Sequence, residues 1–384
     1  MKIVIDDKIP FLRGAFERWA DVVYAPGRNI DAPMVADADA LIVRTRTKCN
    51  AGLLEGSRIR IVASATIGFD HIDTAWLEQH GIKWANAPGC NSGSVMQYIT
   101  SLLLCLAQKH SLDLQVLTLG VVGVGNVGSK VARAAEALGM KVLLNDPPRQ
   151  RREEGTKLHA EADRGGTEFH PLRKLLTDCD IITLHVPLNR DGEDKTFHLL
   201  GRHNIPVMKR DAILINSSRG EVVDNIALRD ALKEGLLRGA ALDVWEGEPD
   251  TDAELVALTD IATPHIAGYS VDGKANATTN SVRVVAEELG LPMHGWLPEG
   301  LPQPAEPVIN LAGVSGNSLD LVSRAVFHTY PIEEDDHLFR NGRENFEYLR
   351  DNYRIRREFG SYSVRTDDRE AGQILQNLGF QIIE

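Results

Sequence analysis

Residues 117–128 read LTLGVVGVGNVG, and this stretch decides the fold of the domain that contains it. An apolar run leads into Gly123, Gly125 and Gly128, which have the spacing G-x-G-x-x-G. In this pattern the first glycine permits a tight turn and the second lets the backbone approach a pyrophosphate. The third lets the following helix pack closely on the strand. The stretch therefore predicts a strand, a phosphate-binding turn and a helix over 126–138.

The residues after this helix indicate which dinucleotide is bound. A second predicted strand, 141–145, ends at Asp146, which lies 23 residues beyond Gly123. An acid at roughly 20 residues from the turn meets the adenosine ribose, and its charge repels a 2′-phosphate, so NAD is favoured. Three arginines follow closely and keep NADP as the alternative: Arg149, Arg151 and Arg152.

The composition limits the possible classes of function. The chain has 384 residues and a formal net charge of −12, which argues against a nucleic-acid partner. Its four cysteines have no C-x-x-C spacing, so we expect reduced thiols in a cytoplasmic protein and no metal site. Residues 1–10 lack the pattern of a signal peptide, and the longest apolar run, near 99–107, is too short for a membrane span.

Short strands alternate with helices along most of the chain, which predicts parallel α/β sheets. In the N-terminal part we expect strands at 2–5, 22–24, 38–43, 60–63 and 82–85, and helices at 14–20 and 73–80. A long apolar helix, capped by Ser92 or Ser94 and continuing to 107, is expected to be buried between domains. Later strands are expected at 181–185, 212–216, 240–244 and 261–263, with a helix capped by Asp224 and an exposed loop over 147–166.

The C-terminal part has a pattern of its own. Four prolines between 298 and 307 indicate a linker. Beyond it we expect helices at 319–327, 344–353 and 369–378, and strands at 361–364 and 380–383. With fewer than 80 residues this segment has a small core, and packing on a partner subunit would stabilise it.

Three later loops each follow a strand of the predicted dinucleotide sheet, so they meet at its carboxyl edge. The first carries Arg219, the second Glu248 and the third His265. Hydride transfer from a 2-hydroxy acid needs a base for the hydroxyl proton, a cation for the carboxylate and an acid that orients the base. Beside a dinucleotide site, these residue types predict an NAD-dependent dehydrogenase.

The motifs NxxRG at 216–220, DVxxxEP at 243–249 and TPHIAG at 263–268 resemble the D-2-hydroxyacid dehydrogenase superfamily. The resemblance extends over about residues 2–290. It implies that Arg219 binds the substrate and polarises its carbonyl, that His265 is the acid/base, and that Glu248 is its partner. It also implies a substrate domain completed by a return segment after the His265 loop.

Other motifs are similar to the erythronate-4-phosphate dehydrogenase family of that superfamily: ATxGxDH at 65–71, PGCN at 88–91, DPP at 146–148 and HIAGY at 265–269. The resemblance implies a homodimer that oxidises 4-phospho-D-erythronate to (R)-3-hydroxy-2-oxo-4-phosphooxybutanoate with NAD, in pyridoxal phosphate biosynthesis. It implies Thr45, Thr66 and Tyr269 at the substrate, and Arg44, Thr45 and Thr66 are our candidates for the far end of the substrate. At the cofactor, besides the three glycines, the resemblance implies Asn126, Val127, Asp146, Val186, Asp243 and Gly268, and we also expect Ser218 there.

The expected architecture is α/β with three parts. A flavodoxin-like substrate domain would comprise 1–93 and 266–290, and a doubly wound Rossmann NAD domain would comprise 94–265. A linker and a small α+β dimerisation domain would occupy 291–384.

Two other functions stay open. The chain could be another enzyme of the superfamily, acting on 3-phosphoglycerate or on hydroxypyruvate and glyoxylate, with the C-terminal extension as a regulatory module. It could also be a non-catalytic NAD-sensing protein, because one fold hosts many functions. Each site residue has a structural alternative too: Arg219 in an ion pair, His265 or Tyr269 in packing, and the basic run 44–48 as a solvated surface.

Overall fold

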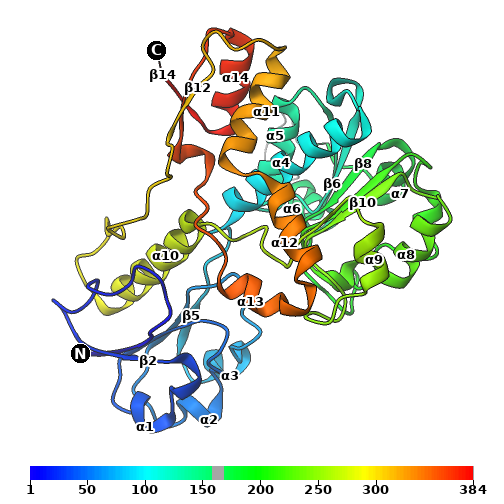
Figure 1. The fold of residues 1–384 in the computed structure, drawn as a ribbon. Helices are drawn as coiled ribbons and strands as arrows, with labels where there is room; N and C mark the ends of the chain where they lie inside the picture. Colours follow the sequence, from blue (N-terminus) through cyan, green and yellow to red (C-terminus); the bar gives the residue numbers. More distant parts are fainter. Residues whose placement is uncertain (158–167, 384) are drawn as a thin grey trace. The chain divides into compact units, whose positions relative to one another are not determined.

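The computed structural model describes residues 1–157 and 168–383, and the chain forms two compact units (Figure 1). The first unit comprises 1–91 and 270–303, and the second comprises 92–269 and 304–384. Each unit contains its own parallel sheet, which confirms the α/β prediction. In the described residues no helix is both long and apolar enough to cross a membrane.

The first unit contains a five-stranded parallel sheet in the order β2-β1-β3-β4-β5, the flavodoxin-like order that we expected. Its strands are β1 (Lys2–Asp6), β2 (Asp21–Ala25), β3 (Ala40–Val43), β4 (Ile61–Ser64) and β5 (Lys83–Ala85). Its helices are α1 (Ala32–Val35), α2 (Ala51–Leu54), α3 (Thr74–Gln79) and α10 (Val271–Leu289). Helix α10 places Val282 and Val285 in the same apolar cluster as Ile3 and Ile5 of β1, so the return segment completes this unit.

The helix predicted at 14–20 is wrong, because these residues form turns. Gly14 has φ +89° and Phe11 has φ +62°, and such left-handed residues interrupt a helix where it would begin. Phe16 and Ala15 are nevertheless buried in the cluster with Ile3 and Ile5. The apolar spacing therefore reflected packing on the sheet and not a helical repeat.

The second unit contains a six-stranded parallel sheet in the order β11-β10-β9-β8-β6-β7. Its strands are β6 (Thr118–Val122), β7 (Lys141–Asn145), β8 (Ile181–Leu184), β9 (Ile213–Asn216), β10 (Gly239–Leu242) and β11 (Ile261–Ala262). A parallel bridge between Leu144 and Phe169 extends the sheet beyond β7. With Phe169 at the outermost position next to β7, the strand order is that of the doubly wound dinucleotide-binding fold.

The helices of this sheet are α4 (Ser92–His110), α5 (Gly128–Ala137), α6 (Pro147–Lys157), α7 (Leu172–Asp178), α8 (Asn225–Lys233) and α9 (Ala253–Leu258). As predicted, Asp224 caps α8 by accepting a hydrogen bond from Ala227 N. Helix α6 replaces the first part of the loop that we expected over 147–166, and residues 158–166 of that loop lie outside the described residues. The Asp146 carboxylate accepts from Arg149 N in the first turn, and Pro147 is tolerated there because it lacks an N–H that would be unpaired anyway.

The C-terminal segment forms a small three-stranded parallel sheet in the order β12-β13-β14. Its elements are β12 (Val308–Asn310), α11 (Ser318–Thr329), α12 (Ile332–Asn341), α13 (Phe346–Asp351), β13 (Ser363–Arg365), α14 (Arg369–Leu378) and β14 (Gln381–Ile383). Six 3-10 turns complete the structure: η1 (Gly27–Asn29), η2 (Leu114–Val116), η3 (Ile205–Val207), η4 (Gly220–Val222), η5 (Arg343–Asn345) and η6 (Phe359–Ser361). Sequence analysis missed α12, because its first turn is acidic and few of its positions are buried.

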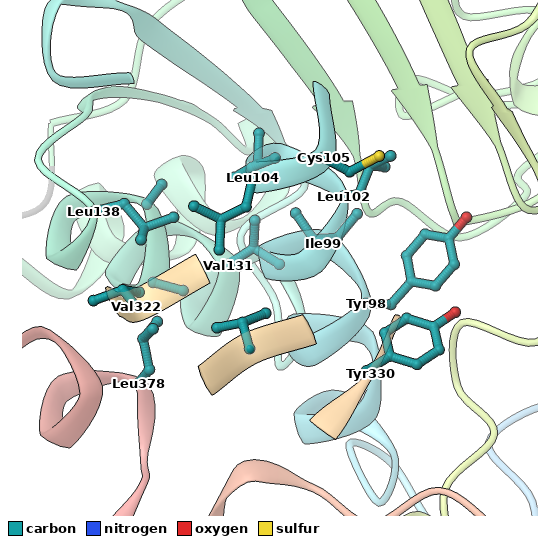
Figure 2. Packing of buried hydrophobic residues seen from close by; sticks show 14 of the residues in the cluster. Tyr98, Ile99, Leu102, Leu104, Cys105, Val131, Leu138, Val322, Tyr330 and Leu378 are labelled. Carbon is teal, nitrogen blue, oxygen red and sulfur yellow. The ribbon is translucent and has the colours of Figure 1, made fainter. Parts of the chain in front are cut away.

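The C-terminal segment shares a core with the dinucleotide sheet. Leu102 and Ile99 of α4 lie in one apolar cluster with Val131 of α5, Val322 of α11 and Leu378 of α14 (Figure 2). Helix α4 is buried along most of its length, as its all-round apolar character predicts. The segment is therefore part of the second unit and not an appendage on a flexible linker.

Candidate active site

The three glycines of the phosphate-binding turn have three different surroundings. Gly123 has φ +87°, and a Cβ on it would lie 2.5 Å from His185 O. A Cβ on Gly128 would overlap the carbonyl oxygen of Gly123, so the start of α5 approaches the turn closely. A Cβ on Gly125 would meet no atom within 4 Å, so its backbone faces open space. These surroundings fit a pyrophosphate lying over Gly125, in front of the N-terminus of α5.

Asp146 is fixed beside this turn. Its Oδ2 accepts from Val124 N at 2.8 Å, and its Oδ1 accepts from Arg149 N at 2.9 Å. Two of the arginines that kept NADP open are held by acids: Arg149 pairs with Glu153 at 2.7 Å and Arg151 with Asp194 at 2.5 Å. The carboxylate is thus in place for an adenosine ribose, which fits NAD.

Asp243 holds the loop that carries His265. The carboxylate is buried, and it accepts from Thr263 Oγ1 at 2.7 Å, from Ile266 N at 2.7 Å and from Ala267 N at 2.9 Å. Burial raises the pKa of Asp243, and these donors together with His265 act in the opposite direction. Asp243 therefore ties the end of β10 to the residues on both sides of His265.

His265 and Glu248 form a direct pair. Nδ1 of His265 lies 2.8 Å from one Glu248 oxygen, and the other oxygen accepts from Trp245 N at 2.9 Å. His265 has φ +58°, an uncommon value for a residue other than glycine, and its backbone N donates to Asp243 O at 2.7 Å. The imidazole is partly exposed and leaves Nε2 for a substrate. A role in packing alone would not require the partly exposed imidazole to be held by the Glu248 carboxylate.

Arg219 projects from a rigid turn. Asn216 Oδ1 accepts from Ser218 N at 3.1 Å and from Ser218 Oγ at 2.8 Å, and Asn216 Nδ2 donates to Arg219 O at 2.9 Å. Arg219 itself is exposed and donates to Ser218 O at 2.8 Å. Among the described residues Arg219 forms no ion pair, so its guanidinium is available to an anion.

The remaining cofactor candidates lie at the same sheet edge. Val186 follows β8 and lies against Gly123, where its Cγ1 would be 2.8 Å from an added Cβ. Gly268 follows the peptides held by Asp243, and Asn126 and Val127 lie between the glycine turn and α5. Ser218 is buried with its hydroxyl on Asn216, so any contribution of this side chain to cofactor binding acts through the loop.

Three substrate candidates belong to the first unit. Thr66 Oγ1 donates to Gly68 O at 2.9 Å and lies 2.6 Å from Ser64 Oγ, so this loop is well fixed. Arg44 Nε pairs with the buried Asp6 at 3.3 Å, and Thr45 beside it is exposed. All three follow the carboxyl ends of strands β3 and β4. Asp6 is a partner of Arg44 that sequence analysis did not identify.

Tyr269 lies in the second unit, next to C-terminal residues that sequence analysis missed. Its ring contacts Tyr353 edge-on at 5.9 Å between centroids, and Arg350 Cζ lies 5.7 Å from its centroid. Burial raises the pKa of Tyr269, and Arg350 opposes that rise. The basic run around 350–357 is visible in the sequence, but nothing in its spacing connects it to the His265 loop.

A G-x-G-x-x-G turn, an acid fixed beside it and an Arg–Glu–His set at the ends of strands of one doubly wound sheet are the features expected of an NAD-dependent dehydrogenase. Residues 106–267 match the model of the D-isomer specific 2-hydroxyacid dehydrogenase NAD-binding domain. Residues 301–379 match a second model, described as a domain of unknown function (DUF3410). A solved D-lactate dehydrogenase from Aquifex aeolicus, complexed with NAD and lactic acid, is 27% identical with a TM-score of 0.57, covering 76% of this chain and 96% of that one.

Curated relatives cover the whole chain. A Bacteroides fragilis erythronate-4-phosphate dehydrogenase is 46% identical over 365 residues, which is 95% of this chain and 99% of that protein. An Escherichia coli erythronate-4-phosphate dehydrogenase is 43% identical over 387 aligned positions, covering 100% of this chain and 99% of that protein. The chain therefore belongs to the erythronate-4-phosphate dehydrogenase family of the D-isomer specific 2-hydroxyacid dehydrogenases. NAD is its cofactor.

Proposed function

We propose that this protein oxidises 4-phospho-D-erythronate to (R)-3-hydroxy-2-oxo-4-phosphooxybutanoate with NAD, as a step of pyridoxal phosphate biosynthesis. The observation that carries the proposal is the 2.8 Å His265–Glu248 pair at the cofactor edge. Relatives at 41–46% identity that bear the erythronate-4-phosphate dehydrogenase name support the choice of substrate.

His265 is the proposed base. With Nδ1 engaged by Glu248, Nε2 is free to take the proton of the C2 hydroxyl. Glu248 keeps the ring oriented and stabilises the imidazolium that forms. When bound, NAD accepts the hydride that leaves C2. The proton on His265 is then released before the next turnover.

Arg219 is the proposed electrophile and carboxylate anchor. Its planar fork matches a carboxylate, and the same cation stabilises charge that develops on the C2 oxygen as the carbonyl forms. Its exposed position on a turn held by Asn216 supports this role. The proposed cofactor residues are Gly123, Gly125, Asn126, Val127, Gly128, Asp146, Val186, Ser218, Asp243 and Gly268.

For the rest of the substrate we propose Arg44, Thr45, Thr66 and Tyr269. An arginine and hydroxyl donors suit a phosphate. The ion pair between Arg44 and Asp6 leaves the guanidinium partly exposed, with 35% of the side chain accessible, so further donors remain for an anion.

The test is NAD reduction with 4-phosphoerythronate, 3-phosphoglycerate and unphosphorylated erythronate, followed by NADH absorbance. Strong preference for 4-phosphoerythronate supports the proposal. Preference for 3-phosphoglycerate keeps the chemistry and replaces the substrate. Tight NAD binding with no turnover of any of the three would favour an NAD-sensing protein.

We also propose a homodimer formed through the C-terminal segment, in the cytoplasm. Four large apolar residues among the described residues of this segment are more than half exposed: Val308, Leu338, Tyr348 and Ile355. A second copy of the chain would cover them. Sedimentation equilibrium of Leu338→Asp and Tyr348→Asp variants should give the monomer mass. An unchanged dimer mass with both replacements would place the interface elsewhere.

A further inference from the structure

Arg356 lies in the core of the second unit, after helix α13, and only 2% of its surface is exposed. Its Nη2 donates to Ala267 O at 2.6 Å and to Ile266 O at 3.4 Å. Its guanidinium Cζ lies 4.5 Å from the centroid of the Tyr330 ring. The cation thus contacts an aromatic face and the two residues that follow His265.

The same two residues are held from their N–H side by Asp243. Ile266 N and Ala267 N donate to the two Asp243 oxygens at 2.7 and 2.9 Å. Two adjacent residues, Ile266 and Ala267, therefore have their N–H donors on a buried carboxylate and their carbonyl oxygens on a buried guanidinium. Each charge offsets part of the cost of burying the other.

The C-terminal segment keeps Arg356 in place. Tyr330 and Tyr353 flank it, and both hydroxyls donate to Asp335, at 2.9 and 2.6 Å. The adjacent backbone is fixed as well, because Gln97 Nε2 of helix α4 donates to Arg357 O at 2.9 Å. The guanidinium therefore has little freedom to leave the His265 loop.

We propose that Arg356 is a positioning residue for His265, through which the C-terminal segment completes the dehydrogenase site. It touches neither substrate nor cofactor in this role. It holds the carbonyls of Ile266 and Ala267 and so keeps His265 in its left-handed conformation, with Nδ1 on Glu248. The inference deepens the proposed function and rests on it.

Arginine suits this place better than lysine. A planar guanidinium stacks on an aromatic ring while an edge nitrogen donates to carbonyls, whereas an ammonium is compact and strongly hydrated. Arg356→Lys should therefore keep the positive charge but lose the simultaneous stacking on Tyr330 and hydrogen bonding to the Ala267 carbonyl. Arg356→Met should lose both.

The first measurement is hydrogen exchange of the peptide that spans 263–269, which needs no substrate. In Arg356→Lys and Arg356→Met we expect faster exchange at Ile266 and Ala267. Arg324→Met is the control, because Arg324 is exposed on helix α11 of the same segment and its side chain forms no ion pair or hydrogen bond among the contacts of the described residues. It should exchange like the wild type in this peptide.

The second measurement is steady-state kinetics with NAD. By analogy with residues that orient metal ligands, whose loss costs roughly 10- to 100-fold, we expect kcat to fall by that factor in Arg356→Met and less in Arg356→Lys. The KM for NAD should change by less than about threefold, because the glycine turn is untouched. Arg324→Met should keep the kcat of the wild type.

The outcomes separate the positioning role of Arg356 from the proposed oxidation of 4-phosphoerythronate. Unchanged exchange at 263–269, with activity reduced only in proportion to the folded fraction, would make Arg356 an ordinary core residue and overturn the inference. If Arg356→Met does not fold, Arg356→Lys decides by the same two measurements. A wild-type protein that does not oxidise 4-phosphoerythronate would reject the proposed substrate, while the exchange result would still judge the role of Arg356.

Discussion

The glycine turn and the His265 loop lie at the same edge of one sheet, but they are built in different ways. The turn at 123–128 depends largely on steric limits between neighbours in sequence, such as Gly128 against Gly123, with His185 O beside Gly123 as a more distant neighbour. The His265 loop depends on partners far along the chain: Tyr98, which lies 165 positions from Thr263, and Arg356, which lies 89 positions from Ala267. A local site can be recognised from its spacing, whereas a site assembled by tertiary contacts can be altered from a distance.

The largest effect should come from the His265 loop itself. His265→Ala removes the proposed base, and general acid–base catalysis contributes roughly 10²- to 10⁴-fold, so kcat should fall by about 10³-fold or more. The affinity for NAD, measured by fluorescence titration, should be unchanged because the glycine turn is intact. Turnover at the wild-type rate would show that the base lies elsewhere.

The glycine turn can be broken in two distinguishable ways. Gly128→Ala creates an overlap with the Gly123 carbonyl, and overpacking of this kind costs about 1–3 kcal/mol, so the melting temperature should drop and NAD binding should weaken. Gly125→Ala meets no protein atom, so its melting temperature should match the wild type.

In Gly125→Ala the added methyl lies where we expect the pyrophosphate, so we expect the Kd for NAD to rise by roughly tenfold, or about 1.4 kcal/mol. Calorimetry of both variants with and without NAD measures these effects. Equal melting temperatures for the two variants would contradict the separate roles of these glycines.

Glu248 should have a smaller effect than His265. Glu248→Gln keeps the shape of the side chain but removes the charge that stabilises the imidazolium, so we expect kcat to fall by roughly 10- to 100-fold. The KM for NAD should hardly change. Loss of NAD binding in this variant would indicate that Glu248 supports the cofactor site and not His265.

The smallest effect concerns His185, which directly follows strand β8 and lies beside the glycine turn. Burial lowers the pKa of His185 from 6.5 to about 3. Between these two values the unfolded chain binds a proton that the folded chain does not, so the free energy of unfolding decreases as pH falls, by up to about 1.4 kcal/mol per pH unit. Above a pH of about 6.5 the imidazole is neutral in both the folded and the unfolded chain, so His185 then adds no pH dependence to the free energy of unfolding.

Urea unfolding at about pH 7 and about pH 5 measures this effect. The difference in the free energy of unfolding between the two pH values should be about 2 kcal/mol smaller in His185→Gln than in the wild type. The Thr183 hydroxyl, 3.0 Å from the imidazole, can still bond the glutamine amide. Equal pH dependence in both proteins would mean that His185 is accessible to protons in the folded state.

Much of the fold could be predicted because its signals are local. The strands of both sheets appear as short apolar runs, and the helix over 126–138 follows from the glycines that precede it. The errors arose where tertiary packing replaced local pattern. Phe16 is buried on a turn and not on a helix, and helix α12 is formed although its first turn is acidic.

The sequence by itself determined the glycine turn, the acid beside it and the three residue types of the candidate catalytic set, because each follows from spacing or from the end of a strand. Only the tertiary structure decided how His265 is held. Its loop is bonded on one side by Asp243 and on the other by Arg356 of the C-terminal segment. No periodicity records such contacts, because a hydrogen bond between distant residues depends on packing of whole elements and not on neighbours in the chain.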